Sequence, residues 1–343
     1  MKLNRLTEPL VLAFALIAAT QLAMMFKFDV FSGHLMDPDC YSWLVRATQL
    51  HESGNWFDGV LHRVDPPYGL EQHWTRPFDV LLLIGAWALT PFLGFEAALY
   101  SWGVLISPLL QIFAVFILIW GFAPVFSHRQ LILLAVGFIA QPAIYSAFLA
   151  GRPDHHSLIT FLFVVSLTFV VRMLMAPERK LWAWAGGVVS ALGFWVCIEF
   201  GVFVILPILL TLSILWILKE KYVQFTLFHY FLSLLLFSII ALLIQNRVST
   251  FLRPEVDRLS IVFVFFFTLV FIYSFIVSKY NFINKIFFRT LFSFFSGLFV
   301  LIALYFIYPE IFSKPSPDTV YRAVRSGNLG QSKYIFIFFF FVG

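Results

Sequence analysis

Residues 97–121 read AALYSWGVLISPLLQIFAVFILIWG and contain no charged side chain. A helix that crosses the hydrocarbon core of a bilayer needs about 20 consecutive, mainly apolar residues. The stretch therefore predicts a membrane-spanning α-helix. Further apolar runs of near-spanning length lie at residues 8–26, 130–149, 157–175, 181–198, 200–218, 224–244, 260–278 and 287–308. Together they predict an all-α, polytopic transmembrane bundle of about nine to ten spans.

The composition of the 343-residue chain supports this fold class, because 61% of its residues are hydrophobic, 20% are aromatic and 12% are charged. Soluble proteins are roughly 45–50% apolar and about 25% charged. Soluble and fibrous classes are therefore excluded, and disorder is excluded because 45 Phe and 10 Trp demand burial. The two cysteines, Cys40 and Cys197, are too few for a disulfide scaffold or a thiolate metal site. We expect one integral membrane domain over residues 1–343.

The net charge of +5 indicates orientation rather than nucleic-acid binding. Residues 79–95 form a shorter apolar run that contains Pro91 and follows a long polar segment. If this run lies in the membrane interface without crossing, eleven basic residues before the first helix and around the later short loops all fall on one side, which the positive-inside bias assigns to the cytoplasm. The sequence thus predicts a cytoplasmic N-terminus, a first outer loop over 27–96 and an interfacial helix over 79–95. The basic groups are Lys2, Arg5, Arg129, Arg172, Arg179, Lys180, Lys219, Lys221, Lys279, Lys285 and Arg289.

The two ends of the chain carry separate expectations. Residues 8–26 resemble the apolar part of a signal peptide, but no small-residue cleavage site follows closely, so we expect a retained first helix. Residues 309–333 are expected to form an outer tail. The apolar run 334–343 is too short to span a bilayer, so we expect a helix truncated at residue 343.

On this topology, acidic and histidine residues gather on the outer face. The first group is Asp37-Pro38-Asp39, in the long loop. Two carboxylates this close at a membrane surface can share a divalent cation such as Mg²⁺ or Mn²⁺. The alternative is a solvated loop in which Asp39 caps a helix over 40–52.

The second group is Gly151-Arg152-Pro153-Asp154-His155-His156, where one membrane helix ends and the next begins. An acid beside two imidazoles suits a divalent metal, and the planar guanidinium of Arg152 suits a phosphate oxygen. The alternative is that Asp154 caps the next helix and the histidines lie at the interface. Ionisable residues at this depth favour the functional interpretation.

Two further features lie on the same face. Glu199 is the only acid in the apolar stretch 181–218, where a carboxylate is costly; the alternative is a tight turn at water level. In the first outer loop, His73-Trp74-Thr75-Arg76 places aromatic and cationic groups side by side, which suits a sugar or a phosphate headgroup. For Trp74 the alternative is an interfacial aromatic belt.

Together these residues resemble the GT-C superfamily of membrane glycosyltransferases, particularly the catalytic subunit of oligosaccharyltransferase. The likeness lies in a first helix, a long outer loop that opens with Asp37 and Asp39, and a helix that delivers Asp154-His155-His156 to the same face. Glu199 is similar in placement to a later acidic residue. The resemblance covers about residues 1–200 and extends to uncharacterised bacterial GT-C-type membrane proteins.

The resemblance implies an enzyme that moves a sugar from a polyprenyl-phosphate-linked donor to a lipid, glycan or protein acceptor. The chemistry would take place on the periplasmic face of a bacterial inner membrane. The residues expected to carry catalysis are Asp37, with preference as the proton acceptor, Asp39 and Glu199. Those expected to hold a divalent cation, Mg²⁺ or Mn²⁺, are Asp39, Asp154, His155 and His156. Those expected at the donor phosphate are Arg46, Arg76 and Arg152, and those at the sugar or acceptor are His73 and Trp74.

Residues 1–343 contain neither a soluble C-terminal domain nor a W-W-D type motif, so either transfer of a single sugar instead of protein N-glycosylation, or an incomplete copy of a longer chain, is expected. Two other classes remain open. A transporter or flippase of lipid-linked sugars would use His155, His156 and Glu199 as proton-relay groups, but such proteins often show internal repeats, and none is seen. A non-catalytic membrane subunit would not need acids gathered on one face. The expected partners are the donor and membrane lipids; the oligomeric state is left open.

Overall fold

The computed structural model describes residues 4–63, 69–220, 222–279, 285–309 and 312, and in this part of the chain the fold is an all-α bundle. All nine apolar runs form helices. Seven of the runs are continuous: α1(Asn4–Lys27), α4(Phe95–Phe122), α7(His155–Met175), α8(Lys180–Val196), α10(Val223–Gln245), α11(Ile261–Lys279) and α12(Ile286–Ile307). The expected tail over 309–333 and the run 334–343 lie almost wholly outside the described residues.

Two of the apolar runs contain a change of helix geometry. The run 130–149 divides into α5(His128–Ala140) and α6(Pro142–Ala147), with Gln141 in an extended conformation between them. Pro142 explains the break, since proline lacks an N–H and disfavours helical geometry in the residue before it. The run 200–218 begins as a π-helical turn, η2(Gly201–Ile205), and continues as α9(Leu206–Ile217).

Seven helices in the described part of the chain are long and apolar enough to cross a membrane. They are α1, α4, α7, α10, α11, α12 and a further helix, α3(Arg76–Leu93). The multi-pass membrane class is therefore supported, but the expected count of nine to ten spans is not confirmed.

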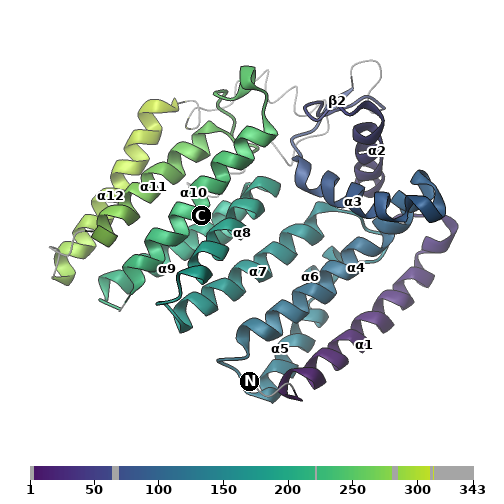
Figure 1. The fold of residues 1–343 in the computed structure, drawn as a ribbon, viewed down its shortest axis with the longest axis horizontal. Helices are drawn as coiled ribbons and strands as arrows, with labels where there is room; N and C mark the ends of the chain where they lie inside the picture. The colour runs from purple at the N-terminus through teal and green to yellow at the C-terminus, as the bar shows by residue number, and fades with distance from the viewer. Residues whose placement is uncertain (1–3, 64–68, 221, 280–284, 310–311, 313–343) are drawn as a thin grey trace.

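The long helices lie side by side and obliquely in Figure 1, with α1 at one edge and α12 at the other. Successive neighbours pack together in the order α1, α4, α7, α8, α10, α11 and α12, while α5 packs on α1 and α4. The core is continuous along most of this row, from Trp43 to Val277. At the far edge, α12 has no buried residue, so it adds little to the core.

One end of the bundle carries the elements of the first loop, and we call it the α2 end (Figure 1). These elements are the short 3₁₀ turn η1(Val30–Ser32), α2(Pro38–Ser53), the antiparallel strands β1(Val60–Leu61) and β2(Leu70–Glu71), and α3. A second 3₁₀ turn, η3(Val248–Thr250), follows α10 at the same end. The indole of Trp56 donates to the carbonyl of Ile244 (2.8 Å), which joins the first loop to the end of α10.

The contacts of α3 bear on whether it crosses the membrane. Just before α3, the hydroxyl of Thr75 donates to the carbonyl of Trp195 (2.6 Å) at the C-terminal end of α8. Trp102 of α4 then folds back on α3 and donates to the carbonyl of Leu81 (3.0 Å). By Ser107, α4 is again at the α2 end, where its hydroxyl donates to the carbonyl of Arg152 (2.6 Å). The start of α3 and the middle of α4 are thus anchored at one end of the bundle, while α3 itself is long and apolar enough to cross a membrane.

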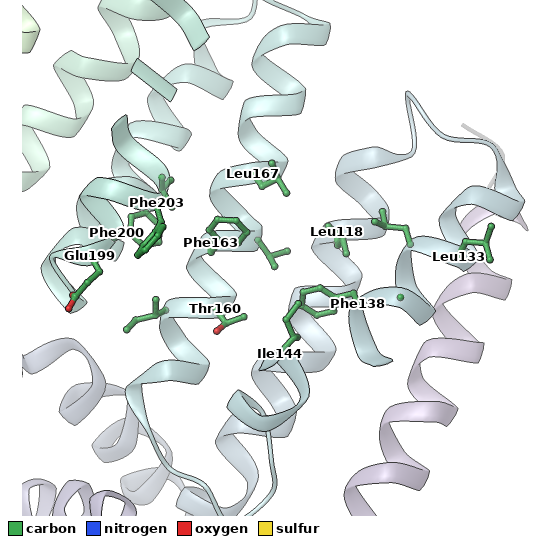
Figure 2. A pocket seen from close by; sticks show the side chains of 15 residues that line it. Leu118, Leu133, Phe138, Ile144, Thr160, Phe163, Leu167, Glu199, Phe200 and Phe203 are labelled. Atoms are coloured by element: carbon green, nitrogen blue, oxygen red, sulfur yellow. The ribbon is translucent and has the colours of Figure 1, made fainter. Parts of the chain in front are cut away.

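An apolar groove of about 660 Å³ lies between α4, α5, α6, α7 and η2 (Figure 2). Its aromatic walls come from Phe138, Phe163, Phe200 and Phe203. Phe203 is 67% exposed, so the groove opens on the surface of the bundle. Glu199 lies at its edge, and its carboxylate points away from the aromatic rings.

Candidate functional site

The segment before α7 is held by main-chain hydrogen bonds to two other parts of the chain. Gly151 donates to the carbonyl of Val104 in α4 (3.1 Å) and accepts from the N–H of Met36, just before α2 (3.1 Å). Gly151 has a φ of 78°, which side chains disfavour, and a Cβ there would lie 2.9 Å from the side chain of Val30. A glycine is therefore required where the first loop meets the start of α7.

Asp154 is the N-cap of α7, as the alternative interpretation of this residue held. Its carboxylate faces the N–H of His156 at 3.5 Å, and its carbonyl accepts from the hydroxyl of Ser157 (2.8 Å). Capping leaves most of the acceptor capacity of this carboxylate for other partners. The cap and functional interpretations of Asp154 are therefore compatible.

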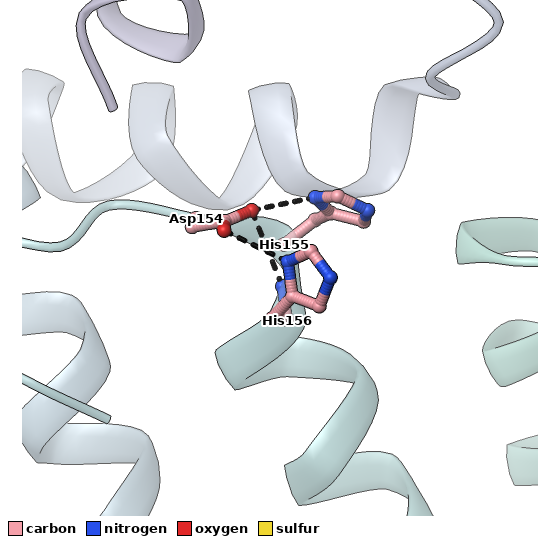
Figure 3. A group of neighbouring side chains, drawn as sticks. All are labelled: Asp154, His155 and His156. Atoms are coloured by element: carbon pink, nitrogen blue, oxygen red, sulfur yellow. Dashed lines mark hydrogen bonds and ion pairs between the residues drawn. The ribbon is translucent and has the colours of Figure 1, made fainter. Parts of the chain in front are cut away.

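Asp154, His155 and His156 form one cluster at the start of α7 (Figure 3). The Nδ1 atoms of His155 and His156 lie 2.6 and 2.8 Å from the two carboxylate oxygens of Asp154. Burial acts to raise the pKa of Asp154, but hydrogen bonds to the two imidazoles outweigh it and hold that pKa below its ordinary value. An ionised carboxylate therefore lies between two imidazoles.

The donor set of this cluster fits a divalent cation. One ligand atom from each residue lies within 4.8 Å of the others. The exposed fraction of the side chain rises along the cluster, from 2% at Asp154 to 14% at His155 and 58% at His156. Imidazole nitrogen and carboxylate oxygen are suitable ligands for several divalent first-row metals, and Mn²⁺ is one of them.

Arg152 joins the two groups that were separate in the sequence. Its Nε lies 3.3 Å from a carboxylate oxygen of Asp37, and its Nη2 lies 3.5 Å from one of Asp154. Nη1 donates to the carbonyl of Ser146 (2.7 Å), which fixes the guanidinium beside α6. The structure therefore brings Asp37 and Asp154 to one arginine, as a shared outer face requires.

The acidic pair at the start of α2 divides into two environments. Asp37, not Asp39, is the N-cap of α2, and one of its oxygens accepts from the N–H and the thiol of Cys40 (both 3.0 Å). The cap expected at Asp39 is thus wrong by two residues. Asp39 is an exposed residue whose pKa is raised by partial burial and by the negative charges of Asp154 and Asp37.

Arg46 and Arg76 do not belong to this cluster, which corrects the expectation that they bind a phosphate. Both guanidinium groups bind Asp79, at 2.9 Å from one of its carboxylate oxygens. Arg46 also donates to the carbonyl of Trp74 (2.6 Å), and Arg76 to that of Trp56 (2.7 Å). The two arginines are 4% and 2% exposed and Asp79 is fully buried. This charge cluster holds α2, α3 and the segment around Trp56 together.

Trp74 is buried instead of offering an open face to a sugar. Its ring is 4.5 Å from that of Trp43 in a stacked pair, and it is 8% exposed. Both indoles lie against His155, with ring centroids 5.3 Å from Trp43 and 5.7 Å from Trp74. Trp74 therefore packs against the His155 ring and helps to hold it in place.

His73 and Glu199 lie near enough to each other for their charges to interact. Burial lowers the pKa of His73, against the opposing influence of Asp257 and Glu199, whose charges are near enough to affect it. His155 acts in the same direction as burial. Glu199 is an exposed residue that accepts from the thiol of Cys197 (2.5 Å). The structure thus brings His73, His155 and Glu199 into one electrostatic neighbourhood.

Three residues of this region were not anticipated from the sequence: Asp79, Trp43 and Asp257. A signal existed for Asp79, which follows Arg76 by three residues in the first turn of a helix, a spacing that brings side chains together. Trp43 reaches His155 only through the docking of α2. Asp257 comes from the segment after α10, and no local pattern indicates its approach to His73.

Comparison with known proteins gives no match: no family model, no curated protein and no solved structure is similar to the chain.

Proposed function

We propose that the chain is a membrane glycosyltransferase of the GT-C type, which moves a sugar from a polyprenyl-phosphate-linked donor to a lipid, glycan or protein acceptor. One juxtaposition carries the proposal. The cluster of Asp154, His155 and His156 lies in the first turn of α7, and the hydroxyl of Thr160, one turn later, lines the apolar groove. A polar site for a phosphate and a sugar thus adjoins an apolar site for a lipid chain.

The groove suits the lipid part of such a donor. Its described lining is apolar apart from Thr160 and Glu199, and it opens on the surface of the bundle. A volume of about 660 Å³ is small for a two-chain lipid. We infer that the first part of a single polyprenyl chain enters sideways from the bilayer, with its phosphate directed toward Arg152.

The polar cluster suits the phosphate and the acceptor. Arg152 would bind the donor phosphate, for which a planar guanidinium is well matched. A divalent cation held by Asp154, His155 and His156 would supply stabilisation of the charge that develops on the leaving phosphate. Asp39, an exposed carboxylate close enough to feel the charges of this cluster, would take the proton from the acceptor hydroxyl.

The step is a single displacement at the anomeric carbon. The bond from that carbon to the phosphate oxygen breaks, and the polyprenyl phosphate leaves with the bonding electrons. The acceptor oxygen bonds to the same carbon from the opposite side, and its proton passes to Asp39. We expect inversion of configuration, as for any single displacement.

The placement of charge supports the proposed orientation in a bacterial inner membrane. Basic residues mark the short links and helix termini at the end opposite α2: Arg129, Arg172, Arg179, Lys180, Lys219, Lys279, Lys285 and Arg289. Positive loops favour the cytoplasm. The N-terminus would then be cytoplasmic and the site periplasmic. The cluster lies at a helix end instead of mid-membrane, which favours an enzyme over a proton-coupled transporter.

The test is sugar transfer in proteoliposomes. Polyprenyl phosphates that carry single radiolabelled hexoses would serve as donors, with and without Mn²⁺. We expect metal-dependent loss of sugar from at least one donor, abolished in Asp154→Asn and retained in Asp58→Asn, a carboxylate of the first loop outside the cluster. Membrane insertion should be unchanged in both. Equal transfer by Asp154→Asn would contradict the proposal.

A further inference from the structure

The end of the bundle opposite α2 carries a second constellation, which takes no part in the proposed reaction. Arg172, in the last turn of α7, lies with its guanidinium carbon 4.1 Å from the ring centroid of Trp120 and 5.9 Å from that of Trp182. The two indoles meet edge to face at 5.8 Å. Three helices, α4, α7 and α8, therefore build an aromatic enclosure around one cation.

The hydrogen bonding of Arg172 is incomplete. Its Nη2 donates to the carbonyl of Trp120 near the C-terminal end of α4. Its Nε is buried and has no hydrogen-bond partner among the described residues. Neither Arg172 nor Arg179 takes part in any of the ion pairs found in the described part of the chain. Within the described residues, therefore, no carboxylate pairs with the positive charge at this corner, although Glu178 precedes Arg179 in the same link.

A second arginine is brought to the same corner by the link between α7 and α8. The N–H of Ala176 donates to the carbonyl of Arg172 (3.1 Å), that of Arg179 to Ala176 (3.0 Å), and that of Trp182 to Arg179 (3.1 Å). Arg179 itself is exposed. On either side of this link, Met175 is 54% and Leu181 68% exposed. Apolar surface thus borders the two cations, as at the boundary between headgroups and acyl chains.

We propose that this corner, formed by Trp120, Arg172, Arg179 and Trp182, binds the phosphodiester of an anionic phospholipid. The planar guanidinium presents several N–H donors to phosphate oxygens, and interfacial indoles lie at headgroup depth. Basic pockets between membrane helices are suited to anionic headgroups. A zwitterionic lipid carries its own cation and leaves the two arginines without a counter-ion, so the corner selects for net negative charge.

The test is native mass spectrometry of the full chain in detergent, titrated with phosphatidylglycerol or phosphatidylcholine. Wild-type protein should bind phosphatidylglycerol the more tightly. The Arg172→Gln, Arg179→Gln double variant should lose about 25-fold in that affinity, from about fivefold per arginine, with phosphatidylcholine unaffected. The matched control is Arg289→Gln, because Arg289 also lies over an indole, that of Trp216 (5.1 Å), and donates to its carbonyl (2.5 Å).

Three outcomes would overturn the proposal. The double variant could keep its preference for phosphatidylglycerol, or the control could lose as much affinity as the double variant. Inorganic phosphate could also displace the lipid at millimolar concentration, which would make the corner a site for free phosphate. If Arg172→Gln fails to fold, Arg179→Gln alone decides the matter, because this exposed side chain should still contribute about fivefold.

Discussion

Arg46 of α2 and Asp79 of α3 form a fully enclosed ion pair, with 2.9 Å between Nε and a carboxylate oxygen. Arg76 binds the same carboxylate, so one buried acid neutralises two buried bases. The pair lies beside the candidate site without belonging to it. Its role is to dock α2, which carries Asp37, Asp39 and Trp43.

Replacing Asp79 by Ala should strongly destabilise the protein, because both arginines would keep their charge in a buried setting without a counter-ion. Losing one partner of a buried pair costs about 3–5 kcal/mol. Chemical unfolding of the purified protein in detergent, followed by tryptophan fluorescence, would measure this. Glu96→Gln, an exposed carboxylate in the first turn of α4, is the control and should change stability by no more than about 0.5 kcal/mol. An unfolding midpoint of Asp79→Ala equal to that of the control would refute the stabilising role of Asp79 between the two arginines.

The expectation that α3 lies in the interface without crossing predicts on which sides of the membrane the loops before and after α4 lie. In a chain with both native cysteines replaced, single cysteines at Asn55 and Val125, both exposed, would be labelled with an impermeant thiol reagent in intact cells. If α3 does not cross, only α4 separates the two positions, so they should lie on opposite sides, with Asn55 outside. Labelling of both positions, or of neither, would mean that α3 spans the membrane.

Asp39 and Asp58 should respond to pH with opposite signs. Partial burial and the charges of Asp154 and Asp37 raise the pKa of Asp39 above its ordinary 3.8. A carboxyl whose pKa is raised in the native protein stabilises the fold while it is protonated, at pH below its ordinary pKa. This contribution is lost as the pH rises through the pKa of the native protein. Asp39→Asn should therefore stabilise the protein at neutral pH, and the gain should vanish on acidification below 3.8.

For Asp58 the balance is reversed. Burial acts to raise its pKa, but hydrogen bonds from His62 and the N–H of Val60 lower it below 3.8. Asp58→Asn should therefore destabilise at neutral pH, with a deficit that shrinks as pH falls through the native value. Unfolding midpoints from about pH 3 to about pH 7, measured with a chelator present, would show both effects. Changes of the same sign in the two variants would refute these assignments.

Gly151→Ala should destabilise the protein by about 1–3 kcal/mol, because alanine at positive φ is strained and its Cβ would meet Val30. Adding Val30→Ala should recover the part of the loss that comes from the clash, and no more. The control is Gly297→Ala in α12, where no atom lies within 4 Å of the new Cβ. In a helix that change should gain about 0.5–1 kcal/mol. Thermal unfolding in detergent is the measurement, and a harmless Gly151→Ala would exclude the strain.

The groove can be filled without disturbing the core. A Cβ at Gly137, which lines the groove, meets no atom within 4 Å. Gly137→Leu should raise the KM for a long-chain polyprenyl donor about 15-fold, because two displaced CH₂ contacts are worth ~1.6 kcal/mol. Stability should not fall, and Gly297→Leu should leave KM unchanged. An unaltered KM in Gly137→Leu would remove the groove from donor binding.

The helices could be predicted because the length of an apolar run is itself the physical requirement for crossing a bilayer. The run 97–121 became α4 (Phe95–Phe122), and the run 157–175 became α7 (His155–Met175). Length alone could not predict the interruption at Gln141, which depends on how Pro142 is accommodated. The gathering of Asp37 and Asp154 followed from topology, because it needed only the side of the membrane on which each segment lies.

The roles of individual side chains were harder to predict. Arg46 and Arg76 carry the same charge whether they bind a phosphate or Asp79, and the sequence does not say which anion is nearer. Trp74 illustrates the same difficulty, because its stacking on Trp43 requires the docked position of α2. The groove could not be predicted because its lining comes from several helices, and no single stretch of sequence indicates it.

The hydrogen bond from the N–H of Met36 to the carbonyl of Gly151 joins the two halves of the site through main-chain atoms alone. Peptide groups are the same whatever side chains the chain carries. Apart from the glycine itself, the register between the two loops therefore does not depend on which residues perform the chemistry. Evolution could exchange the acids, imidazoles and guanidinium group one at a time while this scaffold persisted, so that a change of substrate would not require a change of architecture.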